Sequence, residues 1–306
     1  MKLPKKLKKG DTVGLVCTSS QISEERISQC VDAMQELGYK VKIADNLAAN
    51  YAGFMAGTGE KRAEWVNKMF ADPEVDAIFC VRGGDGSSRI MEFLDVETIK
   101  SNPKIFVGFS DVTNMHLFLT QECDMVSFHG PMVSSNIVGE FNEESKKSLY
   151  ASLEADGEYE FENGEGFEIG VLKEGKAEGV LIGGNLSLLS ASIGTPYEVD
   201  TKDKIIFIEE VGEDISKVEK WTYHLRNAGK FKDCRGVILG QFTNIVCKEM
   251  PEYDELCVYK DALEGLDIPV LYNIQAGHGD PNMTLPMGAL CKIDTSDRTV
   301  KFVAER

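Results

Sequence analysis

The chain has 306 residues, of which 42% are hydrophobic and 27% charged, the composition of a folded globular protein at a length that favours two domains. Its 50 acidic and 33 basic residues give a net charge of −17, which opposes sequence-independent binding to nucleic acid or to an anionic membrane surface. The basic N-terminus contains no long apolar segment, so we expect neither export nor a membrane span. The eight cysteines form no C-x-x-C pair and most lie in apolar runs, so we expect buried free thiols and a cytoplasmic protein.

The first part of the chain alternates strand-like and helix-like segments at the spacing of an α/β protein. Apolar runs predict strands at residues 13–17, 39–45, 75–81 and 104–109. Helical periodicity follows each of them, at residues 22–37, 60–70, 88–94 and 112–120, with Ser23 as the cap of the first helix. This alternation predicts a parallel sheet covered on both faces.

Residues 135–175 interrupt this pattern, because they are acidic and glycine-rich and have no sustained apolar face. Short strands dominate after residue 171, with one helix predicted at 215–228. We therefore expect a Rossmann-like domain at 1–135, an acidic linker at 136–170 with a short helix and a hairpin, and a smaller β-rich α+β domain at 171–306.

The stretch 104–120 joins a buried strand to a helix through Ser110 and Asp111. A serine at such a turn projects from the carboxyl end of the sheet, in the positive field of a helix N-terminus that stabilises an oxyanion. This is the logic of a nucleophile elbow, although the G-x-S-x-G pattern is absent. On this stretch alone the alternative remains open that Ser110 or Asp111 merely caps the helix.

A nucleophilic serine needs a base, and the chain has four histidines. His278 lies in a glycine-flanked loop after a predicted strand, where a catalytic base can be placed. His129 follows a strand-like run near the sheet edge and stays a second candidate. His116 and His224 lie within helices, where a packing or surface role is sufficient.

A histidine base needs an acceptor that fixes its tautomer. The strand KIIFIEEVGE ends in Glu209 and Glu210, which strand alternation places on opposite faces, so only one of them can point into a given cleft. The alternative is a solvated strand end.

The loop 82–86, Arg-Gly-Gly-Asp-Gly, follows a buried strand and can present bare backbone N–H groups to an oxyanion, with the amide of Asp111 as a second donor. The loop does not fit G-x-G-x-x-G, and no Walker pattern occurs, so nucleotide binding is a weak alternative. No H-E-x-x-H or Cys/His cluster occurs, and we expect neither a metal nor another cofactor.

Several separate stretches together resemble the serine LD-carboxypeptidases, a family that includes muramoyltetrapeptide carboxypeptidase and microcin-immunity peptidases. The stretches cover most of the chain except the acidic segment, in the order of the family: GDTVGLVCTSS, AGTGEKRAEWVNKMFADPEVDAIFCVRGGDG, VGFSDVT, SFHGPM, GVLIGGNLSLLSASIGTPYEVD, IIFIEEVGE, LRNAGKFKDCRGVILGQF and GHGDPNMTLPMGA.

The resemblance implies a Ser-His-Glu triad, with Ser110 of the G-F-S-D stretch as nucleophile and Glu209 and His278 as its partners. It assigns the oxyanion hole to the backbone of Gly84 and Asp111. It also implies a Rossmann-like N-terminal domain, a smaller β-rich domain, an active site shared by the two, and a homodimer.

The activity that this resemblance implies is the release of terminal D-alanine from murein tetrapeptide, through cleavage of an L,D-peptide bond after a diamino acid such as meso-diaminopimelate. Asp85 stands where the family often has an aromatic residue, so we expect the side-chain contacts of that loop to differ from those of the family. Two alternatives remain: a microcin-type self-immunity peptidase that cleaves a peptide–nucleotide antibiotic, and a non-catalytic protein that binds murein fragments. The sequence leaves open the third residue of the substrate, and it does not rank Arg82, Arg89 and Arg226 as partners of the terminal carboxylate.

Overall fold

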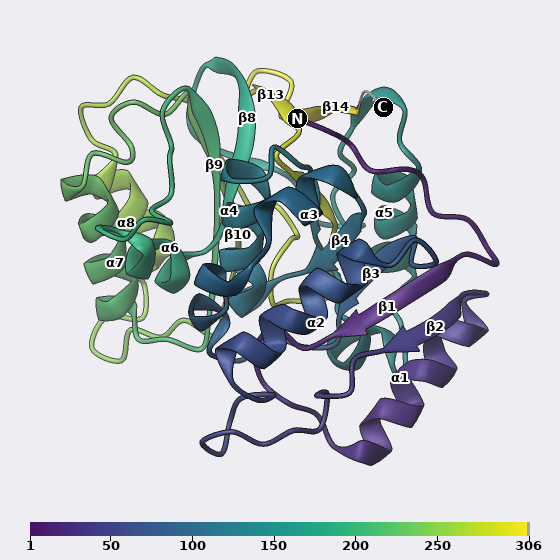
Figure 1. Ribbon diagram of the computed structural model, residues 1–306. Coiled ribbons are helices and arrows are strands. Elements are labelled where there is room, and N and C mark those ends of the chain that lie inside the picture. Colours follow the sequence, from purple (N-terminus) through teal and green to yellow (C-terminus); the bar gives the residue numbers. More distant parts are fainter. Residues whose placement is uncertain (305–306) are drawn as a thin grey trace. The chain divides into compact units, whose positions relative to one another are not determined.

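The computed structural model describes residues 1–304, and their contacts divide the chain into two units, each of which is described by itself (Figure 1). The first unit comprises Met1–Ala155 and Thr284–Pro286; the second comprises Asp156–Met283 and the chain from Met287 on. No helix within residues 1–304 is both long and apolar enough to cross a membrane.

The first unit is built on a six-stranded sheet in the order β12-β5-β4-β3-β1-β2. Its strands are β1 (Thr12–Val16), β2 (Lys40–Ile43), β3 (Ala77–Cys80), β4 (Ile105–Gly108), β5 (Ser127–His129) and β12 (Leu285–Met287). The pairs among β1 to β5 are all parallel. Every residue of β3 and β4 is buried, as expected for central strands that are covered on both faces.

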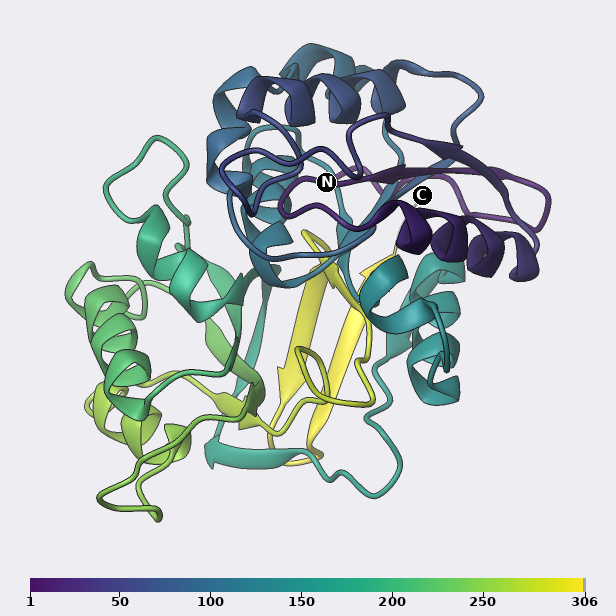
Figure 2. The same cartoon turned by 90° about the horizontal axis from the view of Figure 1, so that it is seen from below.

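The helices of the first unit cover both faces of this sheet. They are α1 (Glu24–Glu36), α2 (Gly59–Ala71), α3 (Val96–Ser101), α4 (Thr113–Gln121) and α5 (Glu143–Glu154), with 3₁₀ turns at Ser87–Arg89, Met91–Phe93 and Ser110–Val112 and a π turn at Val133–Ile137. Helix α1 lies on one face and helices α2 and α3 lie on the other (Figure 2). Ser23 caps α1 as predicted, by accepting a hydrogen bond from the amide of Arg26.

The second unit is built on an eight-stranded mixed sheet in the order β6-β14-β13-β8-β9-β10-β11-β7. Its strands are β6 (Gly157–Glu160), β7 (Gly170–Lys173), β8 (Lys176–Asn185), β9 (Lys204–Val211), β10 (Gly236–Thr243), β11 (Val270–Tyr272), β13 (Leu290–Asp294) and β14 (Thr299–Ala304). The four central strands, from β8 to β11, are parallel, and the outer pairs are antiparallel.

Three helices pack together along one side of the second sheet, α6 (Leu186–Ser192), α7 (Ile215–Asn227) and α8 (Glu255–Ala262) (Figure 1). Helix α7 was predicted, whereas α6 and α8 were not, because each is too short to show a clear 3.6-residue period. The predicted fold class, a Rossmann-like parallel-sheet domain followed by a β-rich domain, is confirmed.

The division between the units falls after Ala155, inside the segment 136–170 that we expected to be a linker. In this segment the structure has the twelve-residue helix α5 in the first unit and strand β6 in the second. Helix α5 begins after its cap Asn142 and buries Leu149 and Leu153, one turn apart. The short helix expected in this segment is therefore confirmed. The expected hairpin is wrong, because β6 pairs with β14 and β7 pairs with β11, so the two strands pair with distant partners instead of each other.

Candidate active site

Ser110 lies in the turn between β4 and α4, as the sequence predicted, and its backbone is in the left-handed region with a φ of +66°. This conformation costs a serine about 1 kcal/mol or more, and such strain is typical of nucleophile elbows. Helix α4 begins after Val112 and receives no hydrogen bond from a capping side chain, and the preceding 3₁₀ turn has none either. The capping alternative is therefore wrong.

The loop that contains Gly83 and Gly84 lies directly against Ser110. A Cβ atom on Gly83 would be 2.8 Å from Cβ and 2.9 Å from Oγ of Ser110, and 3.5 Å from the amide nitrogen of Asp111. Gly84 has a φ of +114°, and a Cβ atom there would be 2.1 Å from Oγ of Ser20. The close approach of this loop to the serine therefore requires both glycines.

The Asp111 side chain is held by the turn at its side. Its Oδ2 accepts a hydrogen bond from the amide of Ser87 at 2.8 Å, and the Ser87 hydroxyl donates to the Asp111 carbonyl at 2.5 Å. Burial raises the pKa of the Asp111 carboxyl, and hydrogen bonds from Ser19 and Ser87 oppose this shift. The sequence predicted a role for the backbone amide of Asp111. The structure adds a role for its side chain, which holds Asp111 in position next to Ser110.

Arg62 of α2 is a buried cation that no pattern in the sequence singles out. Its side chain is 0% exposed, and its guanidinium donates hydrogen bonds to the carbonyls of Thr18, Gly86 (2.9 Å) and Gly57 (3.2 Å). Thr18 lies in the segment after β1, Gly86 in the glycine loop beside Ser110, and Gly57 in the loop before α2. The fork of donors therefore ties three loops of the first unit together.

His278 and Glu209 form a buried pair in the second unit. Nδ1 of His278 lies 2.7 Å from Oε2 of Glu209; the Glu209 side chain is 0% exposed and that of His278 is 17% exposed. Burial opposes a charge on the imidazole, but the carboxylate of Glu209, through its charge and its hydrogen bond, raises the pKa of His278 above its ordinary value. This is how an orienting carboxylate holds a general base.

Glu210 points to the opposite face of β9, as strand alternation predicted. Its carboxylate accepts hydrogen bonds from the Asn185 side chain at 2.8 Å and from the amides of Ser187 and Val211, each at 2.9 Å. Burial raises the pKa of Glu210, and these hydrogen bonds oppose the shift. Glu210 therefore holds the start of α6, and Glu209 is the glutamate that meets the histidine.

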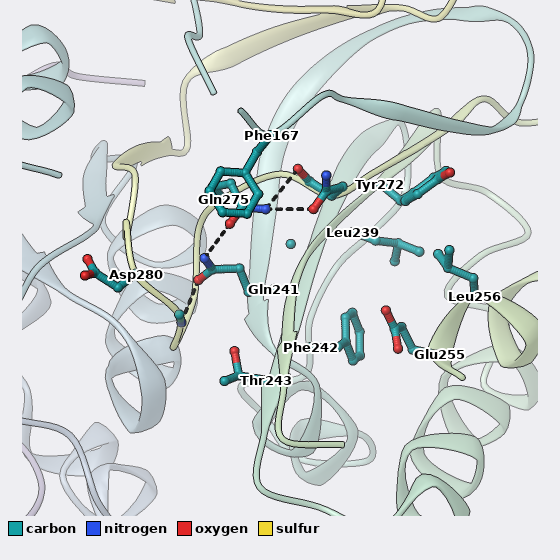
Figure 3. Close-up of a pocket in the computed structure, with 13 residues that line it drawn as sticks. Phe167, Leu239, Gln241, Phe242, Thr243, Glu255, Leu256, Tyr272, Gln275 and Asp280 are labelled. Carbon is teal, nitrogen blue, oxygen red and sulfur yellow. Dashed lines mark hydrogen bonds between the residues drawn. The ribbon is translucent and has the colours of Figure 1, made fainter. Parts of the chain in front are cut away.

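The turn that carries His278 is fastened by Gln241 at the end of β10 (Figure 3). Oε1 of Gln241 accepts from the amide of Gly279 at 2.7 Å, and Nε2 donates to the carbonyl of Pro281 and to Oε1 of Gln275, each at 2.9 Å. One side chain thus holds both sides of the turn. No local sequence signal marks Gln241, because its partners lie 34 to 40 residues away.

The other three histidines, His116, His129 and His224, contact hydroxyl groups, a backbone carbonyl or aromatic rings of the protein. His116 is buried, with Nδ1 2.8 Å from Oγ of Ser127 and Nε2 2.8 Å from the carbonyl of Gly108, and burial together with His129 lowers its pKa to about 3. His129 is fully buried among aromatic rings, and Nδ1 of His224 lies 2.9 Å from Oγ of Ser190.

Of the three candidate arginines, Arg226 donates to the carbonyls of Asp261 and Ala262 at the end of α8, which gives it a structural role. Arg82 and Arg89 are exposed, so both remain candidates for the terminal carboxylate.

The structure thus brings Glu209 to His278 in the second unit, and it brings Ser110 to the glycine loop and the amide of Asp111 in the first. In the part of the chain that the structure describes, no group of three or more His, Cys, Asp or Glu side chains is arranged to hold a metal ion. The eight cysteines are free, and six of them are buried. The first unit therefore supplies a serine with a strained backbone, close to the glycine loop and to the amide of Asp111. The second unit supplies a histidine that a carboxylate holds in place, as in a general base.

Profiles of the LD-carboxypeptidase N-terminal and C-terminal domains match residues 13–130 and 178–293. The chain belongs to the LD-carboxypeptidase family, and the resemblance seen in the sequence is confirmed. Family membership makes the chain a peptidase of the carboxypeptidase class.

The chain is 35% identical over 305 residues to the "Probable murein peptide carboxypeptidase" of Bacillus subtilis, an alignment that covers 98% of this chain and 94% of the relative. A solved structure of the microcin C7 self-immunity protein MccF in complex with aspartyl sulfamoyl adenosine superposes with a TM-score of 0.92 at 25% identity, over 99% of this chain and 98% of the other. The muramoyltetrapeptide carboxypeptidase of Oxalobacter formigenes has the same fold, with a TM-score of 0.84 at 23% identity over 96% and 99% of the two chains.

Proposed function

We propose that the chain is a serine carboxypeptidase that releases the terminal D-alanine of murein tetrapeptide by cleaving an L,D-peptide bond. The observation that carries this proposal is the buried Glu209–His278 pair with its 2.7 Å hydrogen bond. Ser110 supports it, because its left-handed backbone has no role in capping α4. All three residues lie at the positions that the family resemblance assigns to the triad.

In this mechanism the Oγ atom of Ser110 attacks the carbonyl carbon of the scissile amide, and its proton passes to Nε2 of His278. Glu209 accepts the hydrogen bond of Nδ1 and stabilises the imidazolium. The amides of Gly84 and Asp111 donate to the oxyanion. Collapse of the tetrahedral intermediate breaks the C–N bond, and the His278 proton goes to the leaving amine of D-alanine. Water, deprotonated by His278, then attacks the ester carbonyl of the acyl-enzyme. The bond from the acyl carbon to Oγ of Ser110 breaks, and Oγ takes the proton back from His278. The mechanism requires both units to act on one substrate.

The preference for a murein peptide rests on the relative from Bacillus subtilis, which aligns over almost the whole chain. Peptidoglycan recycling in the cytoplasm is part of this proposal, and the eight free cysteines support that reducing setting. A homodimer, implied by the family resemblance, is also part of it, and light scattering of the purified protein tests that state.

A second candidate function is the cleavage of a peptide–nucleotide compound, as in self-immunity to microcin. The TM-score of 0.92 with the microcin self-immunity protein favours it. Comparing kcat/KM on murein tetrapeptide with kcat/KM on an aminoacyl-sulfamoyl nucleotide separates the two candidates, because each predicts the larger value for its own substrate.

The direct test is the release of D-alanine from synthetic murein tetrapeptide by the wild-type protein and by Ser110→Ala. We expect the variant to lose at least three orders of magnitude in kcat, as other serine triads do, with an unchanged thermal midpoint. Full activity in Ser110→Ala would refute the mechanism. A non-catalytic binding protein would instead bind the tetrapeptide, release no D-alanine, and leave Ser110 unlabelled by a serine-directed phosphonate.

A further inference from the structure

A cavity of about 420 Å³ lies in the second unit beside the turn that carries His278 (Figure 3). It is formed where β10 and β11 end, and Gly279 and Asp280, the two residues after His278, are in its wall. Its volume falls within the range of small-molecule subsites, about 300–1,000 Å³. No step of the mechanism above uses this cavity.

The walls of the cavity combine aromatic rings with carboxylates. Phe167, Phe242 and Tyr272 supply the rings, and Glu255 and Asp280 supply the acidic groups. Among the residues that the structure describes, no lysine, arginine or histidine lines it. Within residues 1–304, Glu255 forms no ion pair, and burial raises the pKa of its carboxyl. A cation that entered the cavity would relieve this cost of burial.

The side-chain amides of Gln241 and Gln275 already use both of their N–H groups within the protein (Figure 3). Nε2 of Gln241 donates to Gln275 and Pro281, Nε2 of Gln275 donates to Oδ1 of Asn273 at 2.7 Å, and Nδ2 of Asn273 donates to the carbonyl of Glu168 at 2.8 Å. The charged groups among the described residues of the cavity are thus two carboxylates, with no cation beside them. A ligand carboxylate would find no cation among the described residues of the cavity, whereas an ammonium group would find the carboxylates of Glu255 and Asp280.

We propose that this cavity binds the side chain of the residue whose amide bond is cut, and that it selects an aliphatic side chain ending in an ammonium group without a carboxylate. The inference rests on the proposed carboxypeptidase function and names its substrate class: tetrapeptides with lysine, or with another diamino acid that lacks a free distal carboxylate, at the third position. The methylenes would pack on the aromatic rings, and the ammonium would pair with Glu255. The second carboxylate of free diaminopimelate is disfavoured, because the site repels it.

The experiment uses three tetrapeptides that differ only in their third residue: L-lysine, its neutral isostere L-norleucine, and meso-diaminopimelate. D-Alanine release gives kcat/KM for the wild-type protein, for Glu255→Gln, and for Glu252→Gln as a matched control outside the cavity. We expect the wild type to prefer lysine about tenfold over norleucine and over diaminopimelate, as the loss of one partly buried charge pair allows. The lysine-to-norleucine ratio should fall to about 1 in Glu255→Gln and stay about tenfold in Glu252→Gln.

A lysine-to-norleucine ratio near 1 in the wild type, or the same ratio in Glu255→Gln as in the wild type, would overturn the inference. If no tetrapeptide releases D-alanine, the proposed function fails. Calorimetric binding of the same peptides to Ser110→Ala then tests separately whether the cavity binds an ammonium group. Tighter binding of the lysine peptide that is lost in Ser110→Ala/Glu255→Gln supports the cation site, and equal binding of the lysine and norleucine peptides refutes it. Thermal midpoints identify a variant that has merely unfolded.

Discussion

Gln241 provides a sharp test of how the base is positioned, because one side chain holds the turn of His278. We consider Gln241→Met, which keeps the length of the side chain and removes all its hydrogen bonds. The variant loses the bonds to Gly279 (2.7 Å), Pro281 (2.9 Å) and Gln275 (2.9 Å). At a net value of about 1 kcal/mol each, these three bonds amount to about 3 kcal/mol of stability.

The matched control is Asn67→Leu, which is also isosteric and free of charge. Asn67 fastens a turn of the first unit in the same manner, by donating to the carbonyl of Phe93 and accepting from the amide of Asp95, each at 2.9 Å. Its two bonds amount to about 2 kcal/mol, so Asn67→Leu should be destabilised by about 1 kcal/mol less than Gln241→Met. They should differ in catalysis, because only Gln241 holds the turn that carries the base.

We expect kcat for D-alanine release to fall about 100-fold in Gln241→Met, since a displacement of about 1 Å in a catalytic group costs that much, and to stay within about twofold in Asn67→Leu. Loosening the turn also weakens the contact between Glu209 and His278. Because the carboxylate raises the pKa of the imidazole, the acidic limb of the pH–rate profile should move to lower pH. A Gln241→Met variant with the control's kcat and an unshifted profile would refute the positioning role.

Three further changes test other parts of the site. Glu209→Gln should lower kcat about 10⁴-fold and move the acidic limb of kcat/KM to lower pH, because the charge that raises the pKa of His278 is gone; an unshifted limb in a pH series would contradict this assignment. Gly83→Ala should reduce kcat about 100-fold, because the new Cβ would lie 2.8 Å from Cβ of Ser110; a variant as fast as the wild type would show that the loop can move away freely. The free energy of unfolding should fall by up to about 1.4 kcal/mol per pH unit as the pH drops from 6.5 towards 3, because His116 is neutral in the folded protein and takes up a proton on unfolding. Urea titrations at several pH values should show that the free energy of unfolding of His116→Gln depends less steeply on pH. The same pH dependence in the variant and the wild type would contradict this cause.

Local patterns in the sequence determined the elements that surround the site. The parallel strands of the first unit were predicted by their apolar runs, and the start of α1 by its cap Ser23. Strand alternation alone placed Glu209 and Glu210 on opposite faces of β9. These features depend on residues one to four positions apart, so the sequence displays them directly. The triad itself was assigned through the family resemblance, and its use in catalysis stays a proposal.

Tertiary structure decided the roles of the polar residues. On the sequence of its own stretch, the alternative that Ser110 merely caps a helix stays open, and its left-handed backbone is visible only in the folded chain, where the glycine loop packs against it. In the sequence, Arg62 is indistinguishable from the other charged residues of its helix. In the structure it is fully buried, and carbonyls from three loops accept its hydrogen bonds. Gln241 has no local mark at all. A polar side chain acts through its partners, and these partners lie tens of residues away, so only the folded chain identifies them.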